Sequence, residues 1–215
     1  MTEKEAILQR HSVRNYTDRK IEPTAVEKLN CLIDEVNEQG QLHLQLLTDA
    51  GGTFNRFFSR IMGLGSAPSV IACIGKDADD LDERIGYYGE KIVLAAQQMG
   101  LNTCWAGTFN RDRVPVKLAP DERISIVIAI GYGEAAGKPH RSKKPEQVAN
   151  VTEQSPEWFK SGVEAALQAP TAINQQHFFI RLNEDETVAF EDLGGVFSKV
   201  DLGIVKYHFE VGKQS

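Results

Sequence analysis

Two long segments of this 215-residue chain repeat the same order of local features. The first, PTAVEKLNCLIDEVNEQGQLHLQLLTD, spans residues 23–49, and the second, PEWFKSGVEAALQAPTAINQQHFFIRLNED, spans 156–185. Each begins with proline, continues as an amphipathic helix, and passes through a polar loop into a strand and an acidic turn. The second segment is longer by three residues, which its loop can absorb. The repetition predicts two halves related by a pseudo-two-fold axis.

A second correspondence lies between two helical stretches. RIGYYGEKIVLAAQQMG at 84–100 and DLGIVKYHFEVG at 201–212 both place a glycine near the start of an aromatic and apolar helix. The first is the strongest helical pattern in the chain and is predicted to be central. We therefore expect one domain over 1–215, with unequal halves at 1–150 and 151–215. The alternative is that helix, strand and helix recur by chance, as they do in any mixed fold.

Composition limits the classes of partner and compartment. The net charge is −6 and the isoelectric point is near 5.4, which argues against a broad nucleic-acid surface but not against a local basic pocket for one phosphate. The first residues lack the apolar core of a secretory signal, and no apolar run approaches the roughly 18 residues of a membrane span. The three cysteines show no metal-ligand spacing, so we expect reduced thiols, no metal and a cytoplasmic protein.

RHSVRNY at residues 10–16 is the first candidate ligand site. In an extended strand Arg10, Ser12 and Arg14 share one face. Two guanidinium groups and a hydroxyl suit a phosphate, since they offer charged donors beside a neutral one. The alternative is a solvated basic loop.

Three further stretches could complete a site. In NTCWAG at 102–107, Ala106 and Gly107 would let backbone N–H groups approach a flat ligand, although a buried Trp105 is the simpler interpretation. HRSKKP at 140–145 could supply a second phosphate contact or be ordinary surface. APTAINQQ at 169–176 offers amides that suit a uracil-like ring edge or a ribityl chain, or a turn that satisfies helix-end carbonyls.

Motifs for hydrolysis or phosphoryl transfer are missing. There is no paired-carboxylate motif, no serine elbow and no Walker loop. Any chemistry is therefore expected to be carried by a cofactor.

Taken together, these pieces resemble the FMN-dependent nitroreductase family. RHSVRNY is similar to that family's opening motif, GYYGEKIVLAAQQMGLNTCWAG to its central helix and following loop, and ISIVIAIGYGE with HRSKKP to its last core strand and basic tail. The resemblance covers most of residues 7–145. It implies an α+β, nitroreductase-like fold with mixed or antiparallel sheets flanked by helices.

The chain departs from the usual family pattern at one place. Typical members carry a loop like APTAINQQ directly after their first helix and are homodimers whose partner supplies that loop. Here the first helix ends in NEQGQLHLQ, and the loop lies in the second half. The chain thus resembles a single-chain subgroup in which the dimer is fused, which implies a monomer with one FMN.

The resemblance also implies a role for each candidate residue. Arg10 and Ser12, with His11 adjoining, would hold the FMN phosphate and ribityl chain, and Arg14 would lie near the N1/O2 edge of the flavin as a possible stabiliser of its reduced form. No side chain would be catalytic, because flavin N5 carries the chemistry. The other implied cofactor contacts are Trp105, Ala106 and Gly107 on one flavin face, Thr171, Ile173, Asn174 and Gln176 across the pseudo-interface, and Arg141 and Lys143 at the phosphate.

Two main functions stay open, beside a third, which is another reaction on the same scaffold such as flavin breakdown or dehydrogenation. The first is an enzyme in which NAD(P)H reduces FMN and a small acceptor, such as a nitroaromatic or a quinone, takes the electrons. GGTFNRFFSRIMG at 51–63 could form the acceptor pocket, with Phe54, Phe57 and Phe58 stacking. The second is a flavin-binding or sensor protein with little turnover.

Overall fold

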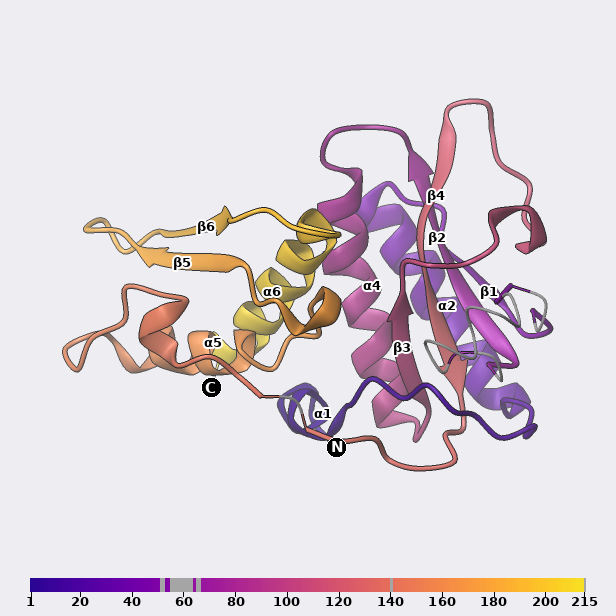
Figure 1. Ribbon diagram of the computed structural model, residues 1–215, viewed down its shortest axis with the longest axis horizontal. Helices are drawn as coiled ribbons and strands as arrows, with labels where there is room; N and C mark the ends of the chain where they lie inside the picture. The colour runs from indigo at the N-terminus through magenta and orange to yellow at the C-terminus, as the bar shows by residue number, and fades with distance from the viewer. Residues whose placement is uncertain (51–52, 55–63, 65–66, 140, 215) are drawn as a thin grey trace.

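The computed structural model describes residues 1–50, 53–54, 64, 67–139 and 141–214. Its helices and strands are shown in Figure 1. They are α1 (Glu3–Gln9), α2 (Pro23–Gly40), β1 (Gln45–Leu47), β2 (Ser69–Lys76), α4 (Leu81–Gln98), β3 (Asn102–Ala106), β4 (Glu122–Gly131), α5 (Glu157–Ala166), β5 (Phe178–Leu182), β6 (Val188–Asp192) and α6 (Ser198–Lys213).

The strands form two separate antiparallel sheets. One has four strands in the order β1-β2-β4-β3, and the other is the β5-β6 hairpin. Helices and antiparallel sheets in one chain confirm the expected α+β class. β3 shows that residues 102–106 form a short strand at one edge of the larger sheet.

The four-stranded sheet is covered on both faces, so its central strands are apolar on both sides. In β2, Ile71 and Cys73 face the larger core while Val70, Ala72 and Ile74 face a second core on the other side. This is the alternation of a pleated strand. The larger core contains α2 and α4, and the second core contains the N-terminal segment that leads toward the site.

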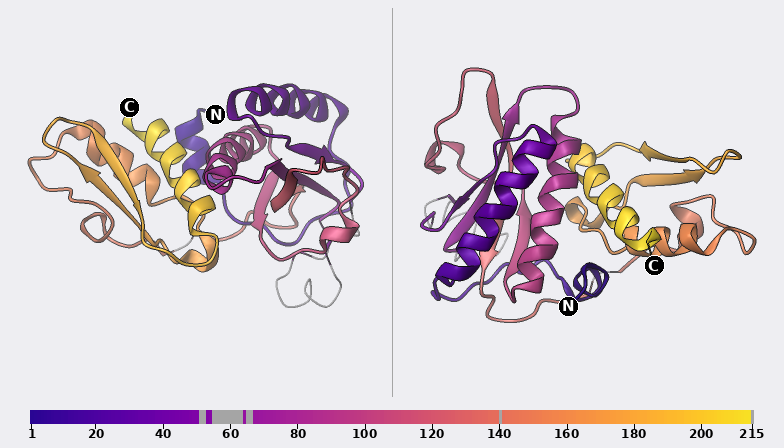
Figure 2. Two further views of the ribbon diagram at one scale, coloured as in Figure 1. Left: turned by 90° about the horizontal axis from the view of Figure 1, so that it is seen from above. Right: turned by 180° about the vertical axis from the view of Figure 1, so that it is seen from behind.

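The second lobe consists of α5, the β5-β6 hairpin and α6, and it joins the first through the crossing of α4 and α6 (Figures 1 and 2). The helices approach so closely at Gly86 and Gly203 that a methyl group at Gly86 would overlap the Val200 carbonyl. A methyl group at Gly203 would overlap the Glu83 carbonyl in the same way. The closeness of this contact fixes how the two lobes meet.

The two repeated segments divide their residues differently between helix and loop. α2 has 18 residues and α5 has 10, and α5 ends at Ala166. α5 begins at Glu157 without a side-chain cap. Ser155 precedes the helix and does not cap it, since its Oγ accepts the Thr152 N–H at 2.9 Å. The early end of α5 leaves residues 167–177 for a long loop before β5.

Parts of the predicted acceptor segment lie outside the described residues. Phe57 and Phe58 belong to this undescribed part. Phe54 is buried in the second core rather than open to a ligand. Among the helices that the structure describes, none is long and apolar enough to cross a membrane.

Candidate functional site

The N-terminal segment reaches the site along the edge of the four-stranded sheet. Ser12 pairs with Thr103 in a single parallel bridge, and the Val13 N–H donates to the Thr103 carbonyl at 3.1 Å. The Tyr16 hydroxyl is buried and donates to the Ala129 carbonyl at 3.3 Å. Val13 and Tyr16 thus anchor the segment in the second core and hold Arg10, Ser12 and Arg14 along one rim.

The loop at 167–177 is held in an unusual backbone conformation. Ile173, Asn174 and Gln176 all have positive φ, at 46°, 58° and 47°. A β-branched residue such as Ile173 rarely adopts this conformation, so the surrounding contacts must impose it. One of these contacts joins the Ala172 N–H to the Asp201 carboxyl on α6, at 3.0 Å from each carboxyl oxygen.

Two adjoining pockets lie where these segments meet. The larger has a volume of about 600 Å³, within the range of cofactor sites, and the smaller has about 230 Å³. Ser12, Arg14 and Thr171 line both pockets. The larger is also lined by Arg10, His11, Lys138, Ile173 and Asn174, and the smaller by Cys104, Trp105, Ala106, Gly107, Ile173, Phe197 and Asp201.

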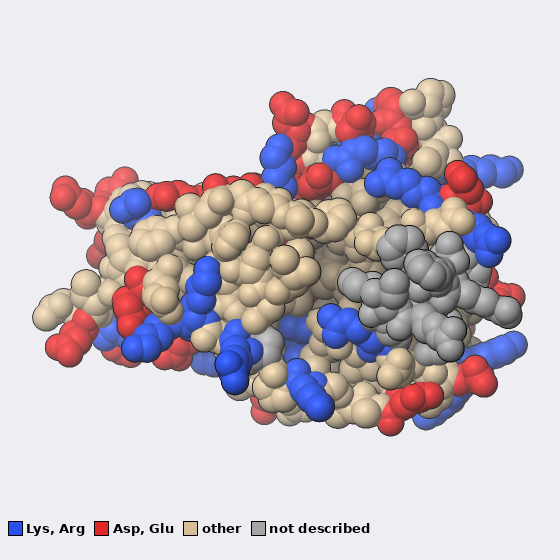
Figure 3. All heavy atoms as spheres, in the orientation of Figure 1, with Lys and Arg blue, Asp and Glu red and all other residues tan. Residues whose placement is uncertain are grey.

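Three stretches that are far apart in the sequence are therefore brought together. Residues 10–14, 105–107 and 171–174 share one composite cavity, as the sequence analysis expected of a single ligand site. Figure 3 shows Lys and Arg side chains gathered at the lower centre of the face where the two lobes meet, with most acidic side chains toward its edges. The surface charge at this place suits an anionic ligand despite the acidic chain.

Arg10 is a buried cation with little compensation. Its side chain lines the larger pocket and only 6% of the residue is exposed. Its guanidinium donates two long hydrogen bonds, one to the Gln168 carbonyl (3.3 Å) and one to Ser12 Oγ (3.4 Å). The Nε atom has no hydrogen-bond partner among the described residues. Burial lowers the pKa of Arg10, and the negative charge of Glu90 acts against that shift. An anion in the pocket would supply the missing charge and acceptor atoms.

Trp105 is fixed from behind by a fully buried carboxyl. Its indole Nε1 donates to Glu90 Oε2 at 2.8 Å, and Glu90 Oε1 lies 2.9 Å from His208 Nε2. His208 Nδ1 faces the Ala165 carbonyl at 3.1 Å, and a carbonyl can only accept, so Nδ1 carries a proton. This network links α4, β3 and α6 and sets the position of Trp105 in the pocket wall.

The smaller pocket contains two ionisable groups whose pKa is raised by burial. Burial raises the pKa of the Cys104 thiol, and Arg14, Arg10 and a hydrogen bond with Ser12 lower it in part. Burial also raises the pKa of Asp201 to about 7, against the hydrogen bonds that it accepts from Gln175 and Ala172. A carboxyl that titrates near neutrality in a pocket wall is typical of functional sites.

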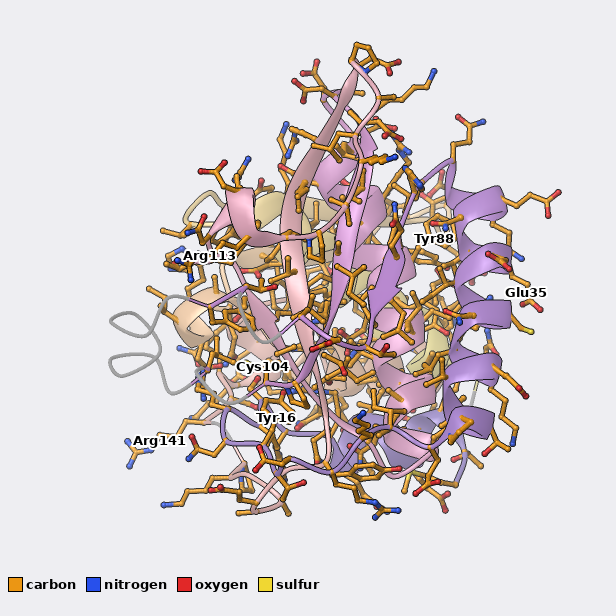
Figure 4. The ribbon with its side chains drawn as sticks, turned by 90° about the vertical axis from the view of Figure 1, so that its right-hand side faces the viewer. Tyr16, Glu35, Tyr88, Cys104, Arg113 and Arg141 are labelled. Atoms are coloured by element: carbon orange, nitrogen blue, oxygen red, sulfur yellow. The ribbon has the colours of Figure 1, made fainter. Side chains whose placement is uncertain are left out.

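Three predicted residues do not line either pocket and bind one another instead. Gln176 is buried, and its Nε2 donates to the Arg141 carbonyl at 2.9 Å and to Asn174 Oδ1 at 2.8 Å. The Lys143 N–H donates to Gln176 Oε1, and Lys143 Nζ donates to the Gln176 carbonyl, both at 2.8 Å. Figure 4 shows the Arg141 side chain pointing outward from the molecule. The structure thus gives Arg141, Lys143 and Gln176 a role in holding the loop, and their contact with a cofactor stays a prediction.

Several residues of the site were missed by sequence reasoning. Lys138 lies two positions before the predicted basic stretch and lines the larger pocket. Phe197 and Asp201 belong to the start of α6, which was predicted only as a helix. Phe197 packs so closely on Gly107 that a methyl group there would overlap its ring. Glu90 had one available signal, because it is an acidic residue in the middle of the helix with the strongest sequence pattern.

The comparisons with known proteins address the fold and the family. The model of the family described as "Putative TM nitroreductase" matches residues 3–213. The chain belongs to this family. No curated protein sequence matches the chain.

Solved structures of nitroreductase-family proteins share the fold. A structure named as a "putative nitroreductase" from Thermotoga maritima aligns with a TM-score of 0.68 at 23% identity, covering 99% of this chain and 83% of that one. A nitroreductase family protein from Clostridium difficile aligns at 0.53 and 20% identity, covering 73% of this chain and 100% of its own. A protein named FMN-dependent nitroreductase, also from Clostridium difficile, aligns at 0.52 and 18% identity, covering 70% and 98%. The nitroreductase-like fold is thereby confirmed.

Proposed function

We propose that this nitroreductase-family chain is an FMN-dependent oxidoreductase that takes electrons from NAD(P)H and passes them to a nitroaromatic, a quinone or a similar small acceptor. The observation that carries the proposal is the composite cavity, in which a buried and undercompensated Arg10 lies next to the Trp105–Gly107 wall and the Thr171–Asn174 loop. Bound FMN would accept two electrons from a nicotinamide and release them to the second substrate.

The hydrogen-bond donors that line the larger pocket suit the phosphate group of FMN. Arg10 and Ser12 would hold the phosphate, which would provide the anion that the buried guanidinium of Arg10 needs. Lys138 lines the same pocket and would add to its positive potential, which the acidic Glu134 in the same wall offsets in part. These residues fit a phosphate better than Arg141, whose side chain points outward.

The wall of the smaller pocket fits a flat ring. Arg14 lines both pockets, where its positive charge would stabilise negative charge on a reduced flavin. Glu90 would keep Trp105 in place beside the ring. The loop with Thr171 and Ile173 would close the site from the second lobe and exclude water.

We further propose that the chain is a fused pseudo-dimer that works as a monomer with one FMN. Support comes from the Clostridium difficile structures, which cover 98–100% of their own length but only 70–73% of this chain. Further support comes from the reciprocal contact of Gly86 and Gly203, which is the pattern of a two-fold interface. Light scattering of the holoprotein should give the mass of one chain, and flavin release should give one FMN per chain.

The absorbance spectrum of the purified protein tests the main proposal. A yellow protein that bleaches with NADPH or NADH under anaerobic conditions, and regains colour when a quinone is added, supports the oxidoreductase. Bound flavin that neither nicotinamide reduces would instead indicate a flavin-binding or sensor protein. A colourless protein that cannot take up FMN would exclude both functions.

A further inference from the structure

Asp201 is a buried carboxyl in the wall of the smaller pocket. It lies in the first turn of α6, and 7% of the residue is exposed. Both carboxyl oxygens lie 3.0 Å from the Ala172 nitrogen, and Oδ2 also accepts the Gln175 Nε2–H at 2.8 Å. No basic side chain among the described residues forms an ion pair with Asp201.

These contacts do not by themselves require an acid. The Ala172 N–H and the Gln175 Nε2–H both reach Oδ2, so a single oxygen at that position, such as the carbonyl of an asparagine, could accept both without the cost of burying a charge. Desolvation and the nearby negative charge of Asp192 raise the pKa of Asp201 to about 7. At neutral pH the pocket therefore holds a carboxyl in both its protonated and its ionised form.

The surrounding ionisable groups do not offset the raised pKa of Asp201. No positive group is among the causes of the shift in the Asp201 pKa. The ionisable residues on the pocket wall and on the elements around Asp201 are Arg14 and Cys104 in the wall, Asp192 on β6, His177 before β5, Glu83 and Tyr87 on α4, and Lys199 and Lys206 on α6 itself. Lys199 Nζ binds the Asp79 carbonyl and Lys206 pairs with Glu83, so both lysines point to α4 or its approach.

We propose that Asp201 is the catalytic acid that protonates the electron acceptor in the composite cavity formed by the two pockets. The inference rests on the proposed function and adds a protein-borne proton source to it. Two-electron reduction of a quinone to a hydroquinone consumes two electrons and two protons. Under the proposed function, both electrons and one proton would reach one quinone oxygen from reduced flavin. The Asp201 carboxyl gives the second proton to the other oxygen, becomes a carboxylate, and regains a proton from water.

Two acceptors separate this role from a structural one. A quinone needs a proton for its reduction, whereas ferricyanide accepts single electrons and needs none. In the flavin-loaded protein, Asp201→Asn should lower kcat/KM for the quinone by on the order of 10²-fold at pH 6. The rate with ferricyanide and the flavin content should change less than about twofold. Glu184→Gln, which makes the same charge change at an exposed site in the β5–β6 turn, is the matched control and should affect neither acceptor.

The pH profile and an infrared titration supply independent readouts. For the wild type, kcat/KM with the quinone should fall as pH rises through about 7. The Asp201→Asn variant should not show this decrease. The carbonyl stretch of a protonated carboxyl should disappear over the same pH range in the wild type and be missing in Asp201→Asn. Equal losses with both acceptors, or an unchanged quinone profile in the variant, would overturn the role of Asp201 alone. A wild type without flavin or without NAD(P)H oxidation would overturn the proposed function as well.

Discussion

Gly86 on α4 and Gly203 on α6 lie against each other, and each contacts the carbonyl three residues before the other: Gly86 that of Val200, and Gly203 that of Glu83. The contact is reciprocal, as at a two-fold axis between identical helices. It joins the lobe that carries Arg10 and Trp105 to the lobe that carries the loop with Thr171. The site exists only where these lobes meet, so its geometry depends on this crossing.

Gly86→Ala should destabilise the protein although alanine favours helix formation. The helical preference is worth about 1 kcal/mol, and the overlap with the Val200 backbone should cost more, since a carbonyl cannot rotate away as a side chain would. We expect a net loss of about 1–3 kcal/mol in the free energy of unfolding, measured by urea titration. Gly203→Ala should behave alike, and the double variant should lose less than the sum because both changes act on one contact. A gain in stability for either single variant would contradict the close crossing.

The buried network behind Trp105 predicts different outcomes for two substitutions at Glu90. Glu90→Ala leaves the indole N–H of Trp105 without an acceptor and His208 without its partner, and it opens a cavity. We expect a loss of about 3–5 kcal/mol by chemical denaturation. Glu90→Gln keeps the shape, can accept from Trp105 and can donate to a neutral His208, so its loss should stay below about 2 kcal/mol. Equal losses in the two variants would show that hydrogen bonding at Glu90 is not what matters.

Arg10→Ala combined with Ser12→Ala should abolish flavin retention while the protein stays folded. Loss of a charged hydrogen-bond donor costs about 1.5–3 kcal/mol, or roughly 10–100-fold in Kd, and the hydroxyl adds to this. Flavin content after gel filtration and fluorescence titration with FMN measure the effect, and circular dichroism checks the fold. Arg141→Ala is the matched control, since its outward side chain should contribute little. If Arg141→Ala lost flavin to the same extent, the phosphate would have to lie elsewhere.

The raised pKa of Asp201 predicts how stability depends on pH. The folded value of about 7 lies above the unfolded value of about 3.9, so between these values the folded state keeps a proton that the unfolded state has released. The contribution of Asp201 to the free energy of unfolding is therefore largest below about pH 4 and decreases as pH rises to about 7. The full change is at most about 4 kcal/mol. Asp201→Asn should gain stability relative to the wild type from pH 4 to pH 8 in denaturation series, and parallel curves would refute the shift.

Gln176 should act on the site through the loop. Gln176→Ala removes hydrogen bonds to the Arg141 carbonyl, Asn174 and the Lys143 N–H, which tie residues 141–143 to the loop. We expect about 2–3 kcal/mol of destabilisation and a weaker affinity for FMN, with faster amide hydrogen exchange at 171–176. Gln175→Ala offers a comparison on the same loop, because the Gln175 amide binds Val196 and Asp201 instead. Unchanged exchange in Gln176→Ala would contradict the anchoring role.

The helices and strands could be predicted from the sequence, because each of them depends mainly on residues that are neighbours along the chain. Helical spacing of apolar residues predicted α2 and α4, and the family resemblance implied the core strand β4. RHSVRNY and APTAINQQ could be recognised as ligand stretches since their side chains suit anions and ring edges whatever their surroundings. That these distant stretches would meet was implied by the resemblance to the FMN-dependent nitroreductase family.

Only the tertiary structure decided which side chains of those stretches reach the cavity. Gln176 and Lys143 are predicted cofactor ligands, and the structure shows that they also bind each other in a loop with left-handed turns. Asp201 and Glu90 looked like ordinary helix residues, and they became notable only when packing of the second lobe removed water from them. The residues of a segment determine which chemical groups it can bring to a site. Burial, charge state and proximity are properties of the assembled lobes, and no single segment contains them.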